Sequence, residues 1–299
     1  MSVRELRGPR ITLRLRVEEA DGSRLERAVA EAWAAGALGA HEHSGGLDVY
    51  ASAERAAQVR RALESVGLSC TAEEPVEPQD WTLAWQAGLE AIEISPRLLV
   101  RPSFVRSFPR PGQAELVIDP GQAFGTGGHA TTRLALELLD AEAVSSLQGA
   151  RVLDAGCGTG VLGLAALALG AARVFAFDLD PLASEATRAH AAANGLAGRV
   201  AVWTGSWEAV AGAPRFDLVL ANMLRSEMLP LLPGLAAAVG PAGRLILSGL
   251  LAEEEASVVR ALLREGLRVE ARRTRPDPDP GSGSWLALLA GRGAPGAGD

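Results

Sequence analysis

Two hydrophobic periods alternate along the first part of the chain. Residues 11–17, ITLRLRV, alternate apolar and polar side chains, which predicts a half-buried strand. Residues 25–36, LERAVAEAWAAG, have helical spacing and end at a glycine. Two short strands are predicted on either side of residues 44–46, followed by a helix over 53–67 and a strand over 68–73.

The order strand, helix, strand, strand, helix, strand is typical of the ferredoxin-like, split βαβ arrangement. An acidic segment with two prolines, residues 73–80, indicates a linker. In the short helix predicted over 81–90, Trp81 and Trp85 share a face and are expected to pack against a domain, with substrate contact as the alternative. We therefore predict an α+β domain over residues 1–75, a linker with a short helix over 76–97 and a larger domain over 98–299.

The larger domain shows a regular alternation of strands and helices. Segments rich in valine, isoleucine and leucine predict strands over residues 151–156, 173–180, 199–205, 216–222 and 243–249. Helical stretches such as 181–193 and 225–239 separate most of them, and a further helix is predicted over 253–265. This alternation predicts an α/β, Rossmann-like, mostly parallel sheet covered on both faces. Strands over 267–275 and 283–291, joined by a turn-rich segment, predict a closing antiparallel hairpin.

Composition and charge narrow the possible functions. The chain is 48% hydrophobic and 22% charged, which suffices for a folded core. The formal net charge of −7 argues against broad nucleic-acid binding and is compatible with a basic protein or small cationic partner. The chain contains no lysine, so neither a Schiff base nor a lysine general base can operate.

Cysteine usage and hydropathy suggest where the protein works. Cys70 and Cys157 lie far apart and form no metal pattern, so we expect no metal and a reducing compartment. Residues 1–10 have no apolar signal core, and the longest apolar run, residues 161–169, is too short to span a bilayer. We expect a cytoplasmic protein without membrane contact.

The segment VLDAGCGTGVLG, residues 152–163, carries the first candidate binding site. A buried strand reaches Asp154, and the glycines before the next helix are Gly156, Gly158 and Gly160. Glycines let a backbone approach a ligand closely, and the helix start supplies N–H donors. Part of the segment also satisfies G-x-G-x-x-G, so a dinucleotide loop or a tight turn without ligand are alternatives. The full string D-x-G-C-G-T-G is typical of methyltransferases, where the Asp supports the loop and the ammonium group of S-adenosylmethionine.

Polar residues at the ends of two further strands extend this site. Asp178 ends the second strand and is expected to accept hydrogen bonds from ribose hydroxyls. Asp180 competes for this role, although its place before Pro181 favours a helix cap. Asn222 ends the fourth strand and is expected to contact the cofactor or an acceptor amine, with a turn residue as the alternative. It does not begin the Asn-Pro-Pro-Tyr motif of enzymes that methylate adenine or glutamine.

A glycine-dense loop, IDPGQAFGTGGHATT over residues 118–132, is the fourth candidate element. Its position before a helix suggests a lid or cofactor clamp. His129 opens that helix, and a structural role and a catalytic role are both open for it. The loop also carries the predicted cofactor-binding residues Phe124, Gly125 and Thr126.

The string DPGQAFGTGGHATT resembles the DPGxAFGTGTHPTT motif of the ribosomal protein L11 methyltransferase family, also called PrmA. The resemblance continues through DAGCGTGVLG, FDLDPLA, DLVLANML and LSGLL. It implies a class I methyltransferase fold with an N-terminal substrate-recognition domain. It also implies methylation of α-amino and lysine amines of a ribosomal protein, either free or ribosome-bound. The cofactor contacts carried over by position are Thr132, Gly156, Asp178 and Asn222.

Three positions depart from the family pattern. Gly128 stands where the family has threonine, Ala130 where it has proline, and Met223 where it has isoleucine. Losing a proline and gaining a glycine should loosen the loop, which affects turnover more than cofactor binding.

The reaction requires a neutral amine, so positioning by Asn222 is favoured over base catalysis by His129. The alternatives are methylation of another protein's lysine or of a small molecule, a dinucleotide-dependent oxidoreductase, and a non-catalytic protein that binds S-adenosylmethionine. The two linker prolines suggest a semi-rigid hinge, and we expect a monomer.

Overall fold

The computed structural model describes residues 12–18, 28–29, 31–32, 35–37, 39–43, 46–76, 89–120, 125, 127–143, 147–210, 215–277 and 283–292. The chain divides into two compact units, Met1–Leu89 and Glu90–Asp299. This division falls inside the segment predicted as a linker. The helix predicted around Trp81 and Trp85 lies almost entirely outside the described residues.

The smaller unit contains an antiparallel sheet of β1 (Thr12–Glu18), β2 (Gly39–His43), β3 (Gly46–Ser52) and β4 (Cys70–Val76). The strand order is β2-β3-β1-β4, and α2 (Ala56–Ser65) joins β3 to β4. Residues 28–29 and 31–32 are helical. This arrangement is compatible with the predicted split βαβ pattern.

The alternation read in β1 separates two faces of that sheet. Leu15 and Val17 are fully buried in the core of this unit. The intervening Arg16 instead binds Asp48 on β3, with 2.9 Å between Nε and Oδ1. A period of two therefore places apolar side chains on one face and charged side chains on the other.

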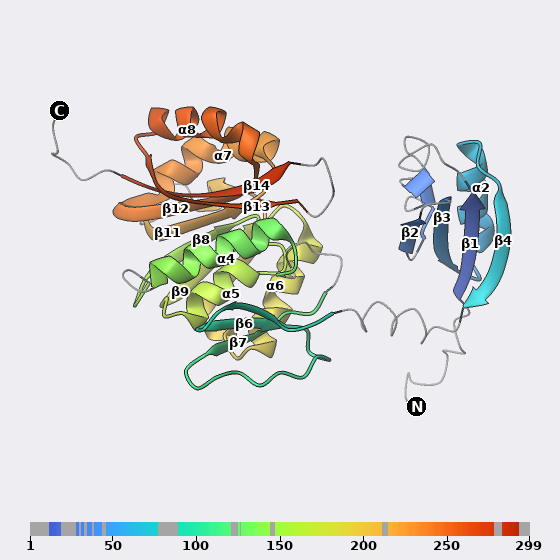
Figure 1. The fold of residues 1–299 in the computed structure, drawn as a ribbon, viewed down its shortest axis with the longest axis horizontal. Coiled ribbons are helices and arrows are strands. Elements are labelled where there is room, and N and C mark those ends of the chain that lie inside the picture. Colours follow the sequence, from blue (N-terminus) through green and yellow to red (C-terminus); the bar gives the residue numbers. More distant parts are fainter. Residues whose placement is uncertain are drawn as a thin grey trace. The chain divides into compact units, whose positions relative to one another are not determined.

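The larger unit is built on a seven-stranded sheet in the order β10-β9-β8-β11-β12-β14-β13 (Figure 1). The strands are β8 (Arg151–Ala155), β9 (Arg173–Asp178), β10 (Val200–Thr204), β11 (Phe216–Asn222), β12 (Val239–Leu251), β13 (Arg268–Pro276) and β14 (Ser284–Gly291). All neighbouring pairs from β10 to β12 are parallel, and β14 is antiparallel to both β12 and β13. The predicted mostly parallel α/β sheet with a closing hairpin is confirmed.

Helices cover both faces of this sheet, as the Val/Ile/Leu-rich strands predict. One face carries α4 (Ala130–Ala143), α5 (Val161–Ala168) and α6 (Pro181–Ala193), and the other carries α7 (Arg225–Ala238) and α8 (Glu255–Arg264) (Figure 1). Each face has its own apolar core, represented by Leu138 and Leu164 on one side and by Leu232 and Leu262 on the other. No helix of the described residues is long and apolar enough to cross a membrane.

A separate sheet precedes α4 and corrects one part of the linker prediction. It contains β5 (Ile92–Ser95), β6 (Leu98–Arg101) and β7 (Ala114–Val117), in that order. β5, placed in the linker by the sequence, pairs with β6 through Ile92 and Val100. Since Ile92 is the strand partner of the fully buried Val100, this segment belongs to the larger unit.

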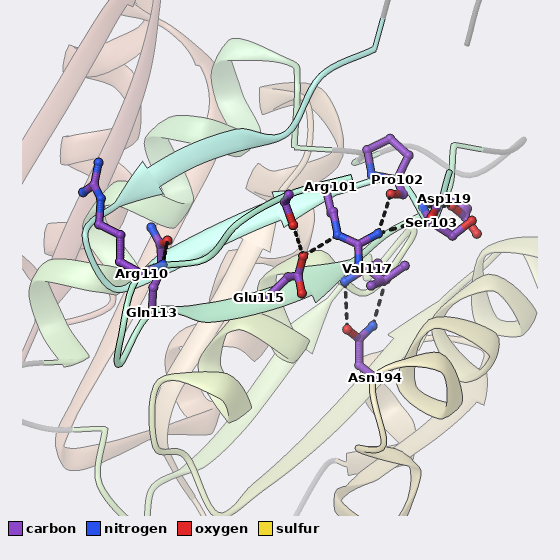
Figure 2. A network of polar contacts seen from close by, with 10 residues as sticks. Arg101, Pro102, Ser103, Arg110, Gln113, Glu115, Val117, Asp119 and Asn194 are labelled. Atoms are coloured by element: carbon purple, nitrogen blue, oxygen red, sulfur yellow. Dashed lines mark hydrogen bonds and ion pairs between the residues drawn. The ribbon is translucent and has the colours of Figure 1, made fainter. Parts of the chain in front are cut away.

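One side chain joins this small sheet to helix α6. Asn194 follows α6, and its side-chain oxygen accepts from the Val117 N–H at 2.8 Å (Figure 2). Its side-chain nitrogen donates to the Val117 carbonyl oxygen, also at 2.8 Å. A single amide thus occupies both backbone hydrogen-bonding groups of Val117 as a neighbouring strand would.

We predict that Asn194→Ala destabilises β7, because it leaves both polar groups of Val117 without their protein partner. The expected loss is about 1–3 kcal/mol in the free energy of unfolding. Thermal unfolding and amide exchange of the 114–119 segment measure it. Glu185→Ala is the control, because Glu185 is exposed on the same helix. Equal exchange in both variants would contradict this role of Asn194.

Candidate active site

A cavity of about 870 Å³ opens at the carboxyl ends of β8, β9 and β11. In parallel sheets of this kind, ligands bind beyond these strand ends. Predicted site residues from four separate segments line it, namely Gly125, His129, Thr132, Gly156, Gly158, Asp178 and Asn222. Among the described residues, no group of three or more His, Cys, Asp or Glu side chains could hold a metal ion.

The loop after β8 requires its glycines. Gly156, Gly158 and Gly160 have φ values of 67°, 54° and 82°, in the left-handed region that other residues rarely adopt. A Cβ atom on Gly160 would lie 2.8 Å from Cγ2 of Thr187. α5 begins directly after Gly160, as predicted. The loop therefore presents backbone without side chains to the cavity at Gly156 and Gly158, whereas Gly160 packs closely against Thr187.

Backbone bonds hold this loop against the end of β9. The Phe177 carbonyl oxygen accepts from the N–H groups of Gly156 and Cys157, at 2.9 and 3.0 Å. The Asp178 side chain continues the contact, since its Oδ2 accepts from the Gly158 N–H at 2.9 Å. Its Oδ1 accepts from the Asp180 N–H at 3.0 Å. A carboxylate has about four lone-pair sites, so two of them remain for a ligand in the cavity.

The structure confirms the helix cap predicted for Asp180. Asp180 is the N-cap of α6, and its Oδ1 accepts from the Leu182 N–H at 2.9 Å. Pro181 at the first helical position removes a donor that would have no partner there. Both aspartates line the cavity, and Asp178 as the ribose acceptor stays a prediction.

Asp154 lies behind the loop. Its side chain is 1% exposed, and its Oδ2 accepts from the Gly163 N–H of α5 at 2.9 Å. It is not among the residues that line the cavity. Burial raises the pKa of Asp154 to about 7, with a further increase from the Asp178 charge, whereas the Gly163 bond lowers it. The structure thus gives Asp154 a role in the loop, and its cofactor contact stays a prediction.

Asn222 and Thr132 meet in the cavity although they are far apart in the sequence. The Asn222 side-chain nitrogen donates to Oγ1 of the buried Thr132 at 3.2 Å. The adjacent Thr131 is fixed by Ser248, whose hydroxyl donates to its carbonyl oxygen at 2.8 Å. The hydrogen bond between Asn222 and Thr132 holds the Asn222 amide at the cavity wall. This position favours a role of Asn222 in the site over a role as a turn residue.

His129 acts as a cap for α4. Its Nδ1 accepts from the Thr131 N–H at 3.3 Å and lies 2.8 Å from Oγ1 of Thr131. Because a backbone N–H can only donate, the neutral ring carries its proton on Nε2. The ring also contacts Trp285 edge to face, with 5.1 Å between centroids. This geometry favours the structural alternative for His129 over a general base.

His190, which the sequence analysis did not select, connects the two glycine-rich loops. Its Nδ1 lies 2.9 Å from the Thr159 carbonyl oxygen, and its Nε2 accepts from the Asp119 N–H at 3.1 Å. The Thr159 hydroxyl in turn donates to the Gly125 carbonyl oxygen. Asp119 is itself held by Ser103, whose N–H donates to its Oδ1 at 2.6 Å (Figure 2). Phe124 and Thr126, two predicted cofactor residues, lie outside the described residues.

A helical spacing in the sequence could have identified this connection. Thr187, His190 and Asn194 recur at i, i+3 and i+7, which places them on one face of α6. Thr187 also donates to the Gly158 carbonyl oxygen at 2.9 Å. This polar stripe on an otherwise alanine-rich helix indicates contacts with loops instead of an apolar core.

Asp154 makes stability depend on pH. Its pKa is raised in the folded protein, so the folded chain keeps a proton that the unfolded chain loses, and stability falls as pH rises from about 4 to about 7. The upper limit of this loss is ~4 kcal/mol. We predict that Asp154→Asn reduces this decrease in the free energy of unfolding with rising pH, as measured by urea unfolding at several pH values. Asp180→Asn keeps a capping side chain and should show the same decrease in stability with pH as the unmodified protein. The same pH dependence of the free energy of unfolding in all three proteins would contradict the prediction.

Comparisons with known proteins agree with this geometry. The family described as "Ribosomal protein L11 methyltransferase (PrmA)" matches residues 32–278. A ribosomal protein L11 methyltransferase from Pelobacter propionicus is 40% identical over 224 residues, covering 73% of this chain and 69% of the relative. One from Sorangium cellulosum is 37% identical over 264 residues and covers 82% of each chain.

A solved structure shows the same fold. The crystal structure of ribosomal protein L11 methylase from Lactobacillus delbrueckii subsp. bulgaricus superposes with a TM-score of 0.59 at 30% identity. The match covers 68% of this chain and 98% of the other. The chain therefore belongs to the ribosomal protein L11 methyltransferase family of S-adenosylmethionine-dependent protein methyltransferases.

Proposed function

We propose that this chain transfers methyl groups from S-adenosylmethionine to amines of ribosomal protein L11, at both its α-amino group and its lysine side chains. The observation that carries the proposal is the meeting of Asn222 and Thr132 in the cavity that Asp178 and the glycine loop also line. Residues suited to bind the cofactor and a residue suited to bind the acceptor amine therefore line the same cavity.

The residues present fit the cofactor. A volume of about 870 Å³ is within the range of small-molecule sites. The free lone pairs of Asp178 suit ribose hydroxyls, and the bare backbone at Gly156 and Gly158 permits close approach. Proposed further contacts are Thr132, Asn222, Asp154 and the loop residues Phe124, Gly125 and Thr126.

When bound, S-adenosylmethionine supplies a methyl group on a sulfonium sulfur: the amine lone pair forms the N–C bond, the S–C pair stays on sulfur, and the methylated nitrogen releases its proton to water. The protein must therefore hold a neutral amine in line with that methyl group. The bond to Thr132 leaves the Asn222 side-chain oxygen free to accept from an amine N–H. The apolar side chains of Met223, Leu224 and Trp285 also line the cavity, so an amine bound beside them would lose part of its hydration.

No strong base is needed in this scheme. An α-amino group with a pKa of about 7.7–8.0 is partly neutral near pH 8, whereas lysine at about 10.4 is mostly charged. Lysine must lose a proton to water before transfer, so positioning and desolvation determine the rate. We assign the His129 ring a structural role as the cap of α4, in which its Nδ1 accepts from the Thr131 N–H, and no role as a base.

The partner and setting follow from the same proposal. The net charge of −7 complements a basic ribosomal protein, free or ribosome-bound. We assign substrate recognition to the smaller unit and expect a cytoplasmic monomer that binds neither nucleic acid nor membranes directly. A lysine of a different protein is the alternative acceptor.

Intact mass spectrometry of purified ribosomal protein L11, incubated with enzyme and S-adenosylmethionine, tests the proposal. We predict that the mass of L11 rises in steps of one methyl group. Asp178→Ala should lower kcat/KM for the cofactor by about 10- to 100-fold, because a charge-assisted hydrogen bond contributes about 1.5–3 kcal/mol. Because this chain contains no lysine, lysine methylation of the enzyme itself cannot contribute to methyl consumption.

Asp180→Asn is the matched control, since it changes a neighbouring cavity carboxylate while keeping the cap of α6. It should retain most of the activity. An unchanged L11 mass with cofactor binding intact would contradict the proposed acceptor and favour another protein's lysine. Cofactor binding without methylation of any protein would favour a non-catalytic binding protein.

A further inference from the structure

The cavity wall contains one carboxylate that no described residue engages. Three carboxylates line the cavity, namely Asp178, Asp180 and Glu227. Asp178 accepts two backbone N–H groups and Asp180 caps α6. The Glu227 side chain forms no hydrogen bond or ion pair with the part of the chain that the structure describes. Its charge is therefore available to a group that enters the cavity.

The start of α7 shows why Glu227 has no partner among the described residues. The N-cap is Leu224, which makes no side-chain capping bond, and the Glu227 backbone N–H donates to the Leu224 carbonyl oxygen at 3.0 Å. The cation nearest in sequence, Arg225, is bound to Glu254 with 2.7 Å between Nε and Oε1. Glu254 is fixed in turn by the Leu251 N–H at 2.9 Å. This pairing directs Arg225 to η3 (Ala252–Glu254), so it does not neutralise Glu227.

The surroundings of Glu227 match the shape of a lysine side chain. Glu227 is solvent-exposed and lies five residues beyond Asn222, at the start of α7. Leu224, the N-cap of α7, and Pro230 and Leu231 of the same helix also line the cavity, and Leu224 is 56% exposed. Apolar surface beside a single carboxylate suits an aliphatic stem that ends in an ammonium group. The other titratable groups on the wall, His129, Cys157, Asp178 and Asp180, belong to the loops and strand ends.

We propose that Glu227 is a specificity-determining residue that receives the cationic lysine amine of the acceptor at the mouth of the cavity. This inference rests on the proposed function and assigns its acceptor side. A carboxylate next to an amine favours the charged form, which cannot attack the methyl group. Glu227 therefore strengthens acceptor binding and does not accelerate transfer, which occurs at Asn222 after the proton is lost.

Glu227→Gln tests this role because it removes the charge and keeps the size. With L11 as acceptor, KM should rise about threefold to tenfold, while kcat at saturating L11 stays the same or rises. Site-resolved mass spectrometry should show that methylation decreases more at lysines than at the α-amino group. At pH 9 only the decrease in lysine methylation should persist, because the α-amine is then neutral. The affinity of L11 for enzyme loaded with S-adenosylhomocysteine should fall by a similar factor, which is a readout independent of activity.

Two further variants separate a local effect from net charge. Glu227→Asp should remain within about twofold of the unmodified enzyme, because it keeps the carboxylate. Glu253→Gln removes an equal charge from an exposed position outside the cavity wall and should change nothing. An unchanged L11 affinity in Glu227→Gln, or an equal loss in Glu253→Gln, overturns the assignment. If the unmodified enzyme does not methylate L11, the proposed function fails first, which is a distinguishable result.

Discussion

The attachment of the glycine loop to the end of β9 is the constraint on which the site depends. Three consecutive backbone N–H groups, those of Gly156, Cys157 and Gly158, donate to Phe177 and Asp178. Buried donors of this kind must be paired, and here one strand end pairs all of them. Because the carboxylate of Asp178 supplies one of these acceptors, the residue that shapes the loop is also the residue that faces the cavity.

Helix α6 extends this constraint to the second glycine-rich loop. Thr187 reaches the carbonyl oxygen of Gly158, His190 joins Thr159 to Asp119, and Asn194 binds both polar groups of Val117. The small sheet before α4 and the loop after β8 are therefore held to one helix face. The base of the glycine-rich loop is thus fixed by contacts with α6 and the loop after β8. Gly125 is fixed by Thr159, independently of Gly128 and Ala130.

Much of the larger unit could be predicted from the sequence, because its signals are local. Strands rich in branched residues, Asp180 before Pro181, and a glycine loop before α5 each determine their own conformation. The edge position of β13 and the insertion of β14 beside β12 could not be read in this way, since strand order depends on packing across the sheet. β5 was assigned to the linker because a four-residue strand carries almost no periodic signal.

The candidate site shows the same difference between what local sequence signals predict and what depends on the fold. Asp178, Asn222 and Thr132 could be proposed from motifs, but the bond between Asn222 and Thr132 depends on the fold. His190 carries only the signal of its helical spacing, and Trp285 and Glu227 lie outside any motif, so that the three-dimensional arrangement alone places these two in the cavity. The roles of Asp154 and His129 also needed structure, because burial and capping geometry decide what a carboxylate or an imidazole can do.

The cavity at the ends of β8, β9 and β11 is the proposed cofactor site. Hydrogen–deuterium exchange of the full chain with and without S-adenosylhomocysteine tests it most directly. We expect the ligand to slow exchange in segments 119–132, 154–163 and 176–180 and to leave segment 46–76 of the smaller unit unchanged. Slower exchange confined to the smaller unit, or no change in these three segments at saturating ligand, would contradict it.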